Sequence, residues 1–344
     1  MDVNHSGTVS PTDAVVKRRS PFARALSRLS KRQLNESGLL GALIVVYILL
    51  SVTATGFLTL GNQLNVLRDA ATIGIVAWGM TLVIIAGEID ISIGPAVAFA
   101  SVILAEAATS WGLGVVPGMF LTLALGTALG ALAGLVRVWF NVPSFITTLG
   151  LWSALRGLAQ YITSALPIPL PDNPLLTLAA GNVWKIPTPA VIMFVLLAVF
   201  SFIARKTAYG RSVFAIGGNA SAARLAGINL TRIRVTLFAT NGFLAALSGI
   251  LLAARIGSGS GGAATGLEFD VIAAVVVGGT SLAGGRGSMM GTFLGVLLIT
   301  LIGNGLILLG VNPFFQDVVR GVIIVAAVVV NVVLANRSAR TSST

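Results

Sequence analysis

Long apolar runs separated by short polar or glycine-rich breaks occupy most of the chain. A helix needs about 20 apolar residues to cross the hydrocarbon core of a bilayer. Runs of this length without period-two alternation argue against a strand-based barrel. The pattern therefore predicts an all-α polytopic membrane protein with about ten transmembrane helices. The runs lie near residues 39–58, 65–87, 94–110, 114–136, 145–163, 188–204, 235–256, 268–282, 288–309 and 315–335.

Most of the basic residues lie in three stretches that flank these runs, at residues 1–37, 205–234 and 337–344. Lysine and arginine accumulate on the cytoplasmic side of membrane proteins, so all three stretches are expected to face the cytoplasm. Six runs precede the central stretch and four follow it, and both numbers are even, as this topology requires. We therefore expect cytoplasmic termini, a transmembrane permease domain over residues 38–336 and a cytoplasmic loop over about residues 205–234.

The composition agrees with this topology. Of the 344 residues, 56% are hydrophobic and 10% are charged, and the mean hydropathy is +0.95. Because about 25% of a globular domain is charged, the missing charge indicates segments that never meet water. We interpret the net charge of +11 as a signal for the orientation of the chain in the membrane. It does not indicate a nucleic-acid partner, since no hydrophilic domain carries the charge. The chain has no cysteine and one histidine, in the polar tail, so we expect no disulfide and no metal site.

Two parts of the chain share an order of features. Glycines spaced by four occur in or beside the runs at 114–136 and 288–309, and such ladders let helices approach closely in lipid. Each ladder follows a run that ends in glycine and a polar break, at residues 86–90 and 278–281. In the topology above the two copies are antiparallel, which predicts two inverted repeats with interrupted helices, as in transporters. The alternative is a chance match between glycine-rich helices.

Polar residues at the breaks are candidates for lining a substrate pathway. Glu88 and Asp90 interrupt an apolar stretch, where carboxylates are costly unless they face water, a partner or backbone donors. We favour a role in capping a re-entrant helix that begins near Ser92 over direct contact with substrate. A proton relay is a further alternative. The pathway candidates are Glu88, Asp90, Ser92, Thr147, Thr280 and Ser281.

Other charged residues lie near the ends of predicted spans. We interpret them as interface anchors, because long charged side chains snorkel toward the membrane surface. The segment at residues 257–262, rich in glycine and serine, is interpreted as a linker without contacts. The charged residues are Arg137, Arg156, Arg255, Arg286, Arg320, Glu106, Glu268 and Asp270.

A short helix is predicted inside the basic loop. Asn219 is a helix cap, residues 220–226 follow as helix formers, and Gly227 is a stop signal. Its small residues and one arginine suit docking into a groove on another protein, whereas composition alone favours a plain basic connector. The chain contains no G-x-x-x-x-G-K-[ST] loop, so we expect no ATP hydrolysis by it.

Four motifs follow one another along the chain. They are residues 86–94 (AGEIDISIG), residues 141–150 (NVPSFITTLG) followed by Arg156-Gly157, residues 217–228 (GGNASAARLAGI) and residues 277–287 (VGGTSLAGGRG). With these motifs the chain resembles, from about residue 39 to 335, the permeases of bacterial ABC sugar importers. These are the ribose, xylose and arabinose type, in the larger family shared with branched-chain amino acid permeases. Glu88 departs from the family pattern G-G-I-D-L-S-V-G and adds a carboxylate near the expected cavity.

The resemblance implies a transport subunit, not an enzyme, that carries a monosaccharide such as ribose or xylose across the bacterial inner membrane. It implies a second permease copy, forming a homodimer surrounded by membrane lipid, and a periplasmic sugar-binding protein. It also implies a cytoplasmic ABC ATPase that binds ATP and Mg²⁺, with no cofactor in this chain. Residues 219–228 would form the coupling helix, and the residues expected at the ATPase are Gly218, Asn219, Ala222, Ala223, Arg224 and Gly227.

Three alternatives stay open at this stage. An ion-coupled secondary transporter would use Glu88 or Asp90 as its proton site and would need no ATPase. Within the ABC class, the solute could instead be a nucleoside, a polyol, an autoinducer or a hexose. A structural or receptor-like membrane subunit without a pathway is a further alternative.

Overall fold

The computed structural model describes residues 31–340, so most of the predicted basic leader and the last four residues lie outside the described residues. Of the described helices, the first begins at Lys31 and the last continues to Arg340, inside the two predicted tails. The helices are α2 (Lys31–Thr53), α3 (Leu60–Ile85), α4 (Ile93–Ala108), α5 (Val115–Trp139), α6 (Ser144–Ile162), α7 (Pro174–Ala180), α8 (Thr188–Lys206), α9 (Ala208–Gly218), α10 (Ala220–Leu225), α11 (Leu230–Ile256), α12 (Leu267–Val277), α13 (Met289–Leu308) and α14 (Pro313–Arg340).

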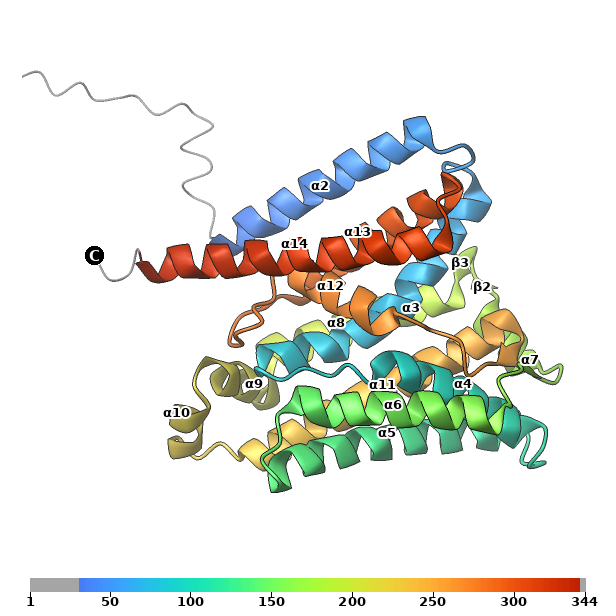
Figure 1. Cartoon of the computed structure of the whole chain (residues 1–344), viewed down its shortest axis with the longest axis horizontal. Helices are drawn as coiled ribbons and strands as arrows, with labels where there is room; N and C mark the ends of the chain where they lie inside the picture. The colour runs from blue at the N-terminus through green and yellow to red at the C-terminus, as the bar shows by residue number, and fades with distance from the viewer. Residues whose placement is uncertain (1–30, 341–344) are drawn as a thin grey trace, which may run out of the picture.

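Each of the ten apolar runs forms one helix, and these helices run side by side as a bundle (Figure 1). The prediction of an all-α membrane protein is confirmed. Within residues 31–340, six helices are long and apolar enough to cross a membrane: α2, α3, α5, α8, α11 and α13. The helices α4 and α12 have 16 and 11 residues, which is shorter than a hydrocarbon core of ~30 Å requires at ~1.5 Å per residue.

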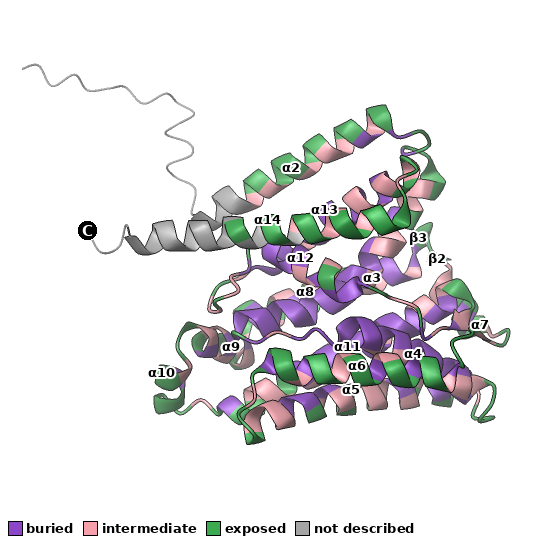
Figure 2. Ribbon diagram, in the orientation of Figure 1, coloured by how far each residue is buried: buried purple, intermediate pink, exposed green. Residues whose placement is uncertain are grey.

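The centre of the bundle is formed by α3, with α8, α11, α12 and α13 around it (Figure 2). Every residue of α3 from Ile73 to Ile85 is buried, as expected for a helix that is apolar on all sides. By contrast, α2 and α6 are largely exposed at opposite edges of the bundle (Figure 2). Their exposed apolar side chains, such as Val52 and Ile146, are the surface that lipid would cover.

The glycine ladders bring helix backbones together, as the sequence predicts. A Cβ atom on Gly130 would meet the carbonyl oxygen of Phe238, so α5 and α11 cross with their backbones in contact. In the same way, Gly291 and Gly295 of α13 face the backbone of α12 at Gly278 and Ala274. Small residues allow this approach in membrane helices because no side chain holds the backbones apart.

The two ends of the bundle differ. At one end, here called the α10 end, α9 and α10 project from the bundle, and at the other, the α7 end, α7, β2 and β3 lie (Figure 1). Two antiparallel strand pairs join the connecting segments: β1 (Ile168–Pro169) with β4 (Ser258–Gly259), and β2 (Asn182–Val183) with β3 (Ile186–Pro187). The first pair fastens the segment after α6 to the end of α11.

The segment at residues 257–262 is not the contact-free linker that the sequence suggests. The Ser260 amide donates to Ser101 Oγ of α4 at 3.2 Å. Gly261 lies against the backbone of Ala159 in α6, and its carbonyl oxygen accepts a hydrogen bond from Arg156 Nη1 at 2.7 Å. Glycine and serine serve here for close packing, and composition cannot distinguish that use from flexibility.

Candidate functional site

Two helix breaks form the centre of the site. The helix α3 ends with the amides of Gly87 and Glu88 bonded to the carbonyls of Ile84 and Val83. The helix α12 ends in the same way, with the amides of Gly279 and Thr280 bonded to Val276 and Val275. Both glycines have positive φ, +77° and +86°, as a Schellman cap requires. The shared run-glycine-polar pattern in the sequence therefore reports a shared way of ending a helix.

The two breaks touch each other. The amide of Gly285, in the break after α12, donates to the carbonyl of Ile85 at the end of α3 at 2.8 Å. Both lie at the α10 end, whereas equivalent points of an antiparallel repeat lie at opposite ends. The breaks are therefore not equivalent points of an inverted repeat, and that part of the sequence argument was wrong.

The last turn of α9 packs into this junction. A Cβ atom on Gly217 would overlap the carbonyl oxygen of Ile85 and lie 2.5 Å from the amide nitrogen of Gly285. Gly284 lies equally close to Gly217 and to Gly87. The loop that leads into α10 thus contacts both breaks through backbone atoms, just before Asn219.

Asp90 ties the residue that precedes α4 to α11. Its Oδ1 accepts hydrogen bonds from the amide of Ser92 at 3.0 Å and from the Ser92 hydroxyl at 2.6 Å, and its Oδ2 accepts from Asn241 Nδ2 at 2.7 Å. The carboxylate is 3% exposed, so these donors replace water, as a buried carboxylate needs. The N-cap residue of α4 is Ser92, and its hydroxyl bonds to Asp90 and not to an amide of the helix. The capping role favoured from the sequence stays a prediction.

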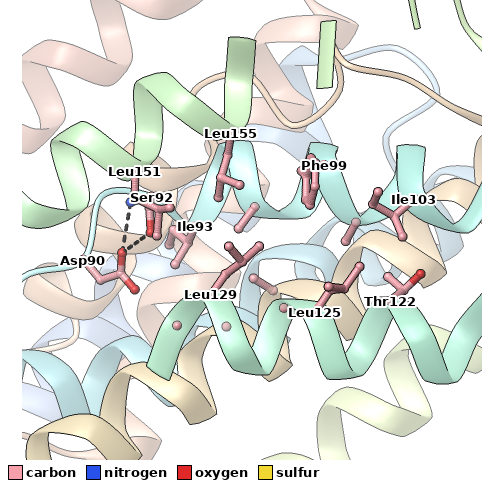
Figure 3. A pocket seen from close by; sticks show the side chains of 16 residues that line it. Asp90, Ser92, Ile93, Phe99, Ile103, Thr122, Leu125, Leu129, Leu151 and Leu155 are labelled. Atoms are coloured by element: carbon pink, nitrogen blue, oxygen red, sulfur yellow. Dashed lines mark hydrogen bonds between the residues drawn. The ribbon is translucent and has the colours of Figure 1, made fainter. Parts of the chain in front are cut away.

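A small cavity opens beside Asp90 and Ser92 between α4, α5, α6 and α11 (Figure 3). Its volume is about 20 Å³, enough for a water molecule, which needs ~10–15 Å³, and too small for a sugar. The carboxylate lies at one end, Thr122 lies at the other, and leucine and isoleucine side chains line the space between them (Figure 3). In this conformation no passage for a solute runs through the cavity.

Two hydroxyls of α6 support the break before α4. Ser144 Oγ accepts from the Ile89 amide at 3.0 Å, and Thr148 Oγ1 accepts from the Ile91 amide at 3.2 Å. Sequence reasoning chose Thr147, which the structure places half-buried with its hydroxyl 3.5 Å from the carbonyl of Pro143 in its own helix. The four-residue spacing of Ser144 and Thr148, which puts both on one helix face, was the signal that could have found them.

Glu88 lies between two arginines at the α10 end. Its carboxylate is 2.9 Å from Arg137 Nε at the end of α5 and 2.7 Å from Arg234 Nε near the start of α11. The Glu88 side chain is 3% exposed and those of both arginines 15%. Arg137 is therefore not an interface anchor, as the sequence suggested, because it neutralises a buried charge. We call these three residues the Glu88 triad.

Other charged residues among the presumed anchors are also paired with residues of other helices. Glu268, buried in α12, accepts from Trp152 Nε1 at 2.8 Å. Arg320 lies 2.6 Å from Asp270, and Arg255 lies 2.6 Å from Asp69. Snorkelling thus explains few of these residues, since their partners come from distant parts of the chain.

The remaining pathway candidates lie in the break after α12. Thr280 is fully buried, and the amide of Ser281 donates to the carbonyl of Arg286 at 3.0 Å. Neither lines the cavity beside Asp90, which is lined by only two of the six candidates, Asp90 and Ser92.

The predicted helix in the basic loop is present as α10. Asn219 Oδ1 accepts from the Ala222 amide at 2.9 Å, and Gly227 has φ +83°. Ala222 is exposed, but Ala223 is buried against Ile216 and Leu230 of the same loop. Leu225, at the tip, is 90% exposed. The apolar side chain that α10 presents outward is therefore Leu225, whereas Ala223 holds the loop together.

The chain is similar to a known protein family and to several known proteins. Residues 62–328 match the family model described as branched-chain amino acid transport system, permease component. The chain is 59% identical over 316 residues to the probable ABC transporter permease protein YphD of Escherichia coli (strain K12), covering 92% of this chain and 95% of that protein.

Two further relatives from the same strain are named for sugars. The ribose import permease protein RbsC is 38% identical over 308 residues, covering 88% of this chain and 95% of that protein. The xylose transport system permease protein XylH is 32% identical over 375 aligned positions, covering 91% and 95%. No solved structure matches the chain.

Proposed function

The chain belongs to the family of permease components of branched-chain amino acid transport systems, and from that premise we propose that it is the membrane-spanning subunit of an ATP-binding cassette importer for a monosaccharide. The observation that carries this proposal is the position of α10. A capped helix with an exposed leucine at its tip projects from the bundle and directly follows the last turn of α9, whose backbone contacts both helix breaks. A partner protein that binds this element from outside the bundle could move the two helix breaks through it.

We propose a pentose, such as ribose or xylose, as the solute. The support comes from the relatives, whose names assign ribose import and xylose transport to proteins that match nearly the full length of this chain. Hexoses, nucleosides, polyols and autoinducers are the rival solutes within the same class.

The proposed assembly contains two copies of this chain, a cytoplasmic ATPase and a periplasmic sugar-binding protein. The ATPase would hold ATP and Mg²⁺ on its own residues. The bundle would lie in the bacterial inner membrane with the α10 end in the cytoplasm. The described ends of α2 and α14 also lie on that side of the bundle (Figure 1), which supports cytoplasmic termini.

We propose ten membrane crossings. In this count α4 and α12 are short helices, and the non-helical residues of the adjacent breaks complete their crossings. We also keep an inverted repeat, between α3–α6 and α11–α14. Its support is packing: α5 contacts α4 and α11, while α13 contacts α12 and α3, so each ladder helix packs on the preceding helix of its own half and on the first helix of the other half.

The geometry supports one route for coupling. A push on α10 would move the last turn of α9, and Gly217 would carry that movement to the backbones at Ile85 and Gly285, which are hydrogen-bonded to each other. Displacing the breaks would open the α10 end, which the Glu88 triad and the hydrogen bonds of Asp90 to Ser92 and Asn241 hold closed. Since the alternating states of a transporter differ in packing and not in chemistry, the permease only converts this movement into access.

Reconstitution with and without the ATPase tests the function. The permease, its cognate ATPase and its binding protein are placed in vesicles, and uptake of radiolabelled ribose and xylose is measured with ATP and without it. We expect uptake that depends on ATP and on the ATPase. Leu225→Glu should reduce uptake at least tenfold without changing the melting temperature of the permease, because Leu225 makes its contacts outside this chain.

Ala223→Glu provides the contrast, because it places a charge inside the loop and should lower the melting temperature itself. Uptake by the permease alone, driven by a proton gradient, would support the secondary transporter and refute the proposal. Unchanged uptake with Leu225→Glu would remove α10 as the contact to the ATPase.

A further inference from the structure

A second hollow lies toward the α7 end, between α3, α12, α13 and α14. Its volume is about 190 Å³, more than ten times the ~10–15 Å³ that one water molecule needs. None of the six pathway candidates lines it. Several isoleucines form its apolar wall, and its polar groups are those of Asp69, Asp270, Thr300, Asn304, Gln316 and Arg320.

One of these polar groups lacks a partner. Thr300 is 5% exposed, and its hydroxyl makes no hydrogen bond with the residues that the structure describes. A buried hydroxyl without a partner costs about 1–3 kcal/mol. A threonine in a helix usually avoids this by bonding to the carbonyl four residues earlier, as Thr81 does to Ala77 at 2.6 Å. An unpaired hydroxyl in the wall of a hollow indicates a site where a bound molecule completes the hydrogen bond.

The charges around the hollow are already paired with each other. Asp270 lies 2.6 Å from Arg320, which also lies 2.8 Å from Asp317. Asp69 lies 2.6 Å from Arg255. An amino-acid zwitterion or a sugar acid would need an arginine free to bind its carboxylate, and Arg320 is held by two carboxylates. The hollow therefore favours an uncharged ligand that exchanges hydrogen bonds with oxygens and amides.

We propose that this hollow is a binding station for a neutral polyhydroxylated solute, with Thr300 as a ligand-contacting residue. The inference rests on the proposed function, since it places the solute on the route of the same permease. Binding sites for small molecules combine an apolar wall with a few placed polar groups, and the isoleucines suit the C–H face of a sugar ring. Hydroxyl and amide contacts are individually weak, which suits a solute that has to leave again.

The absence of cysteine from this chain makes a direct test simple. Thr300→Cys introduces a single thiol, and a membrane-impermeant thiosulfonate is added to the assembled importer in vesicles, with modification measured on the permease by mass. We expect modification of Thr300→Cys and at least a fivefold slower rate with millimolar ribose or xylose, but not with leucine. Thr122→Cys, 1% exposed and beside the small cavity, is the matched control and should stay unmodified.

Three results would overturn the inference. If Thr300→Cys is not modified, the hollow is closed or filled by lipid. If it is modified at the same rate with and without sugar, the hollow is wet but binds no solute. If leucine protects it, the ligand class is wrong. Sugar uptake by the native importer in parallel vesicles separates the two proposals: uptake without protection rejects the station alone, whereas no ATP-dependent sugar uptake rejects the proposed function.

A second variant tests the same contact without a label. Thr300→Val keeps the shape of the side chain and removes its hydroxyl. We expect the KM for uptake to rise severalfold while the melting temperature is unchanged, because the hydroxyl has no partner in the protein to lose. An unchanged KM, or a lowered melting temperature with unchanged KM, would contradict a contact with solute.

Discussion

At the scale of single residues, buried charge is what distinguishes this bundle from a plain set of apolar helices. Glu88 and Asp90 are two residues apart, yet Glu88 is neutralised by two arginines, whereas Asp90 is stabilised by uncharged hydrogen-bond donors. The sequence shows that both carboxylates are exceptional, because each interrupts an apolar run. It does not show their partners, since Arg137, Arg234 and Asn241 come from helices that are distant in the chain.

Glu88→Gln tests the Glu88 triad. The change leaves two mostly buried arginines side by side without a counter-charge, and breaking a buried ion pair costs about 3–5 kcal/mol. We expect the melting temperature of the purified permease to fall by several degrees. Glu106→Gln makes the same chemical change on α4 at a half-buried residue without an ion pair among the described residues. Equal melting temperatures for the two variants would show that the triad contributes nothing.

Thr148→Val tests the support of the break before α4. Removing the hydroxyl leaves the buried amide of Ile91 without its acceptor, at a cost of about 1–3 kcal/mol. Thr147→Val, the neighbouring residue, removes a hydroxyl that bonds only within its own helix. We expect a lower melting temperature for Thr148→Val and almost no change in the melting temperature for Thr147→Val. A larger loss from Thr147→Val would make the residue chosen from sequence the important one.

At the scale of elements, periodicity and punctuation located a helix at each of the ten apolar runs and the short α10, whereas six of the described helices are long and apolar enough to cross a membrane. The ladders of glycine were correctly taken as contact surfaces, because glycine has no other common use at fixed spacing in an apolar helix. The sequence could not show which helix each ladder meets. Nor could it show that the two breaks share one end, since the same cap occurs wherever a helix ends in glycine and a polar residue.

Gly217→Ala tests the junction between α9 and the breaks. The added methyl would overlap the carbonyl of Ile85, and overpacking of this kind costs about 1–3 kcal/mol. Gly218→Ala adds the same methyl one residue later, where nothing lies within 4 Å. We expect reduced ATP-dependent uptake and a lower melting temperature for the first variant alone. Normal uptake with Gly217→Ala would show that the junction tolerates separation and does not transmit movement.

At the scale of the whole molecule, charge and hydropathy established the class before any contact was known. Apolar runs of about 20 residues and basic stretches between them leave few alternatives to a polytopic membrane protein. The pathway was less predictable. Polar side chains at the breaks were taken as its walls, whereas Asp90 and Ser92 bond to each other and Asp90 bonds to Asn241. The larger hollow is lined in part by residues that looked like surface anchors.

The proposed orientation is tested with two single-cysteine variants in intact cells. Trp184→Cys lies at the α7 end, where the side chain is 93% exposed, and Leu225→Cys lies at the tip of α10. An impermeant thiol reagent added outside should modify the first and not the second, and permeabilising the cells should expose both. Modification of Leu225→Cys alone in intact cells would show the opposite topology. The tip of α10 would then lie outside the cell, where it could not contact a cytoplasmic ATPase.

The hydrogen bond between Gly285 and Ile85 has a consequence for the evolution of substrate preference in such a protein. The contact between the ends of α3 and α12 is made by main-chain atoms, so a side-chain substitution cannot adjust it and can only weaken it. If the hollow toward the α7 end binds the solute, as proposed, substitutions there would change solute preference and leave this main-chain contact untouched. Substrate specificity and coupling to a partner would then evolve independently.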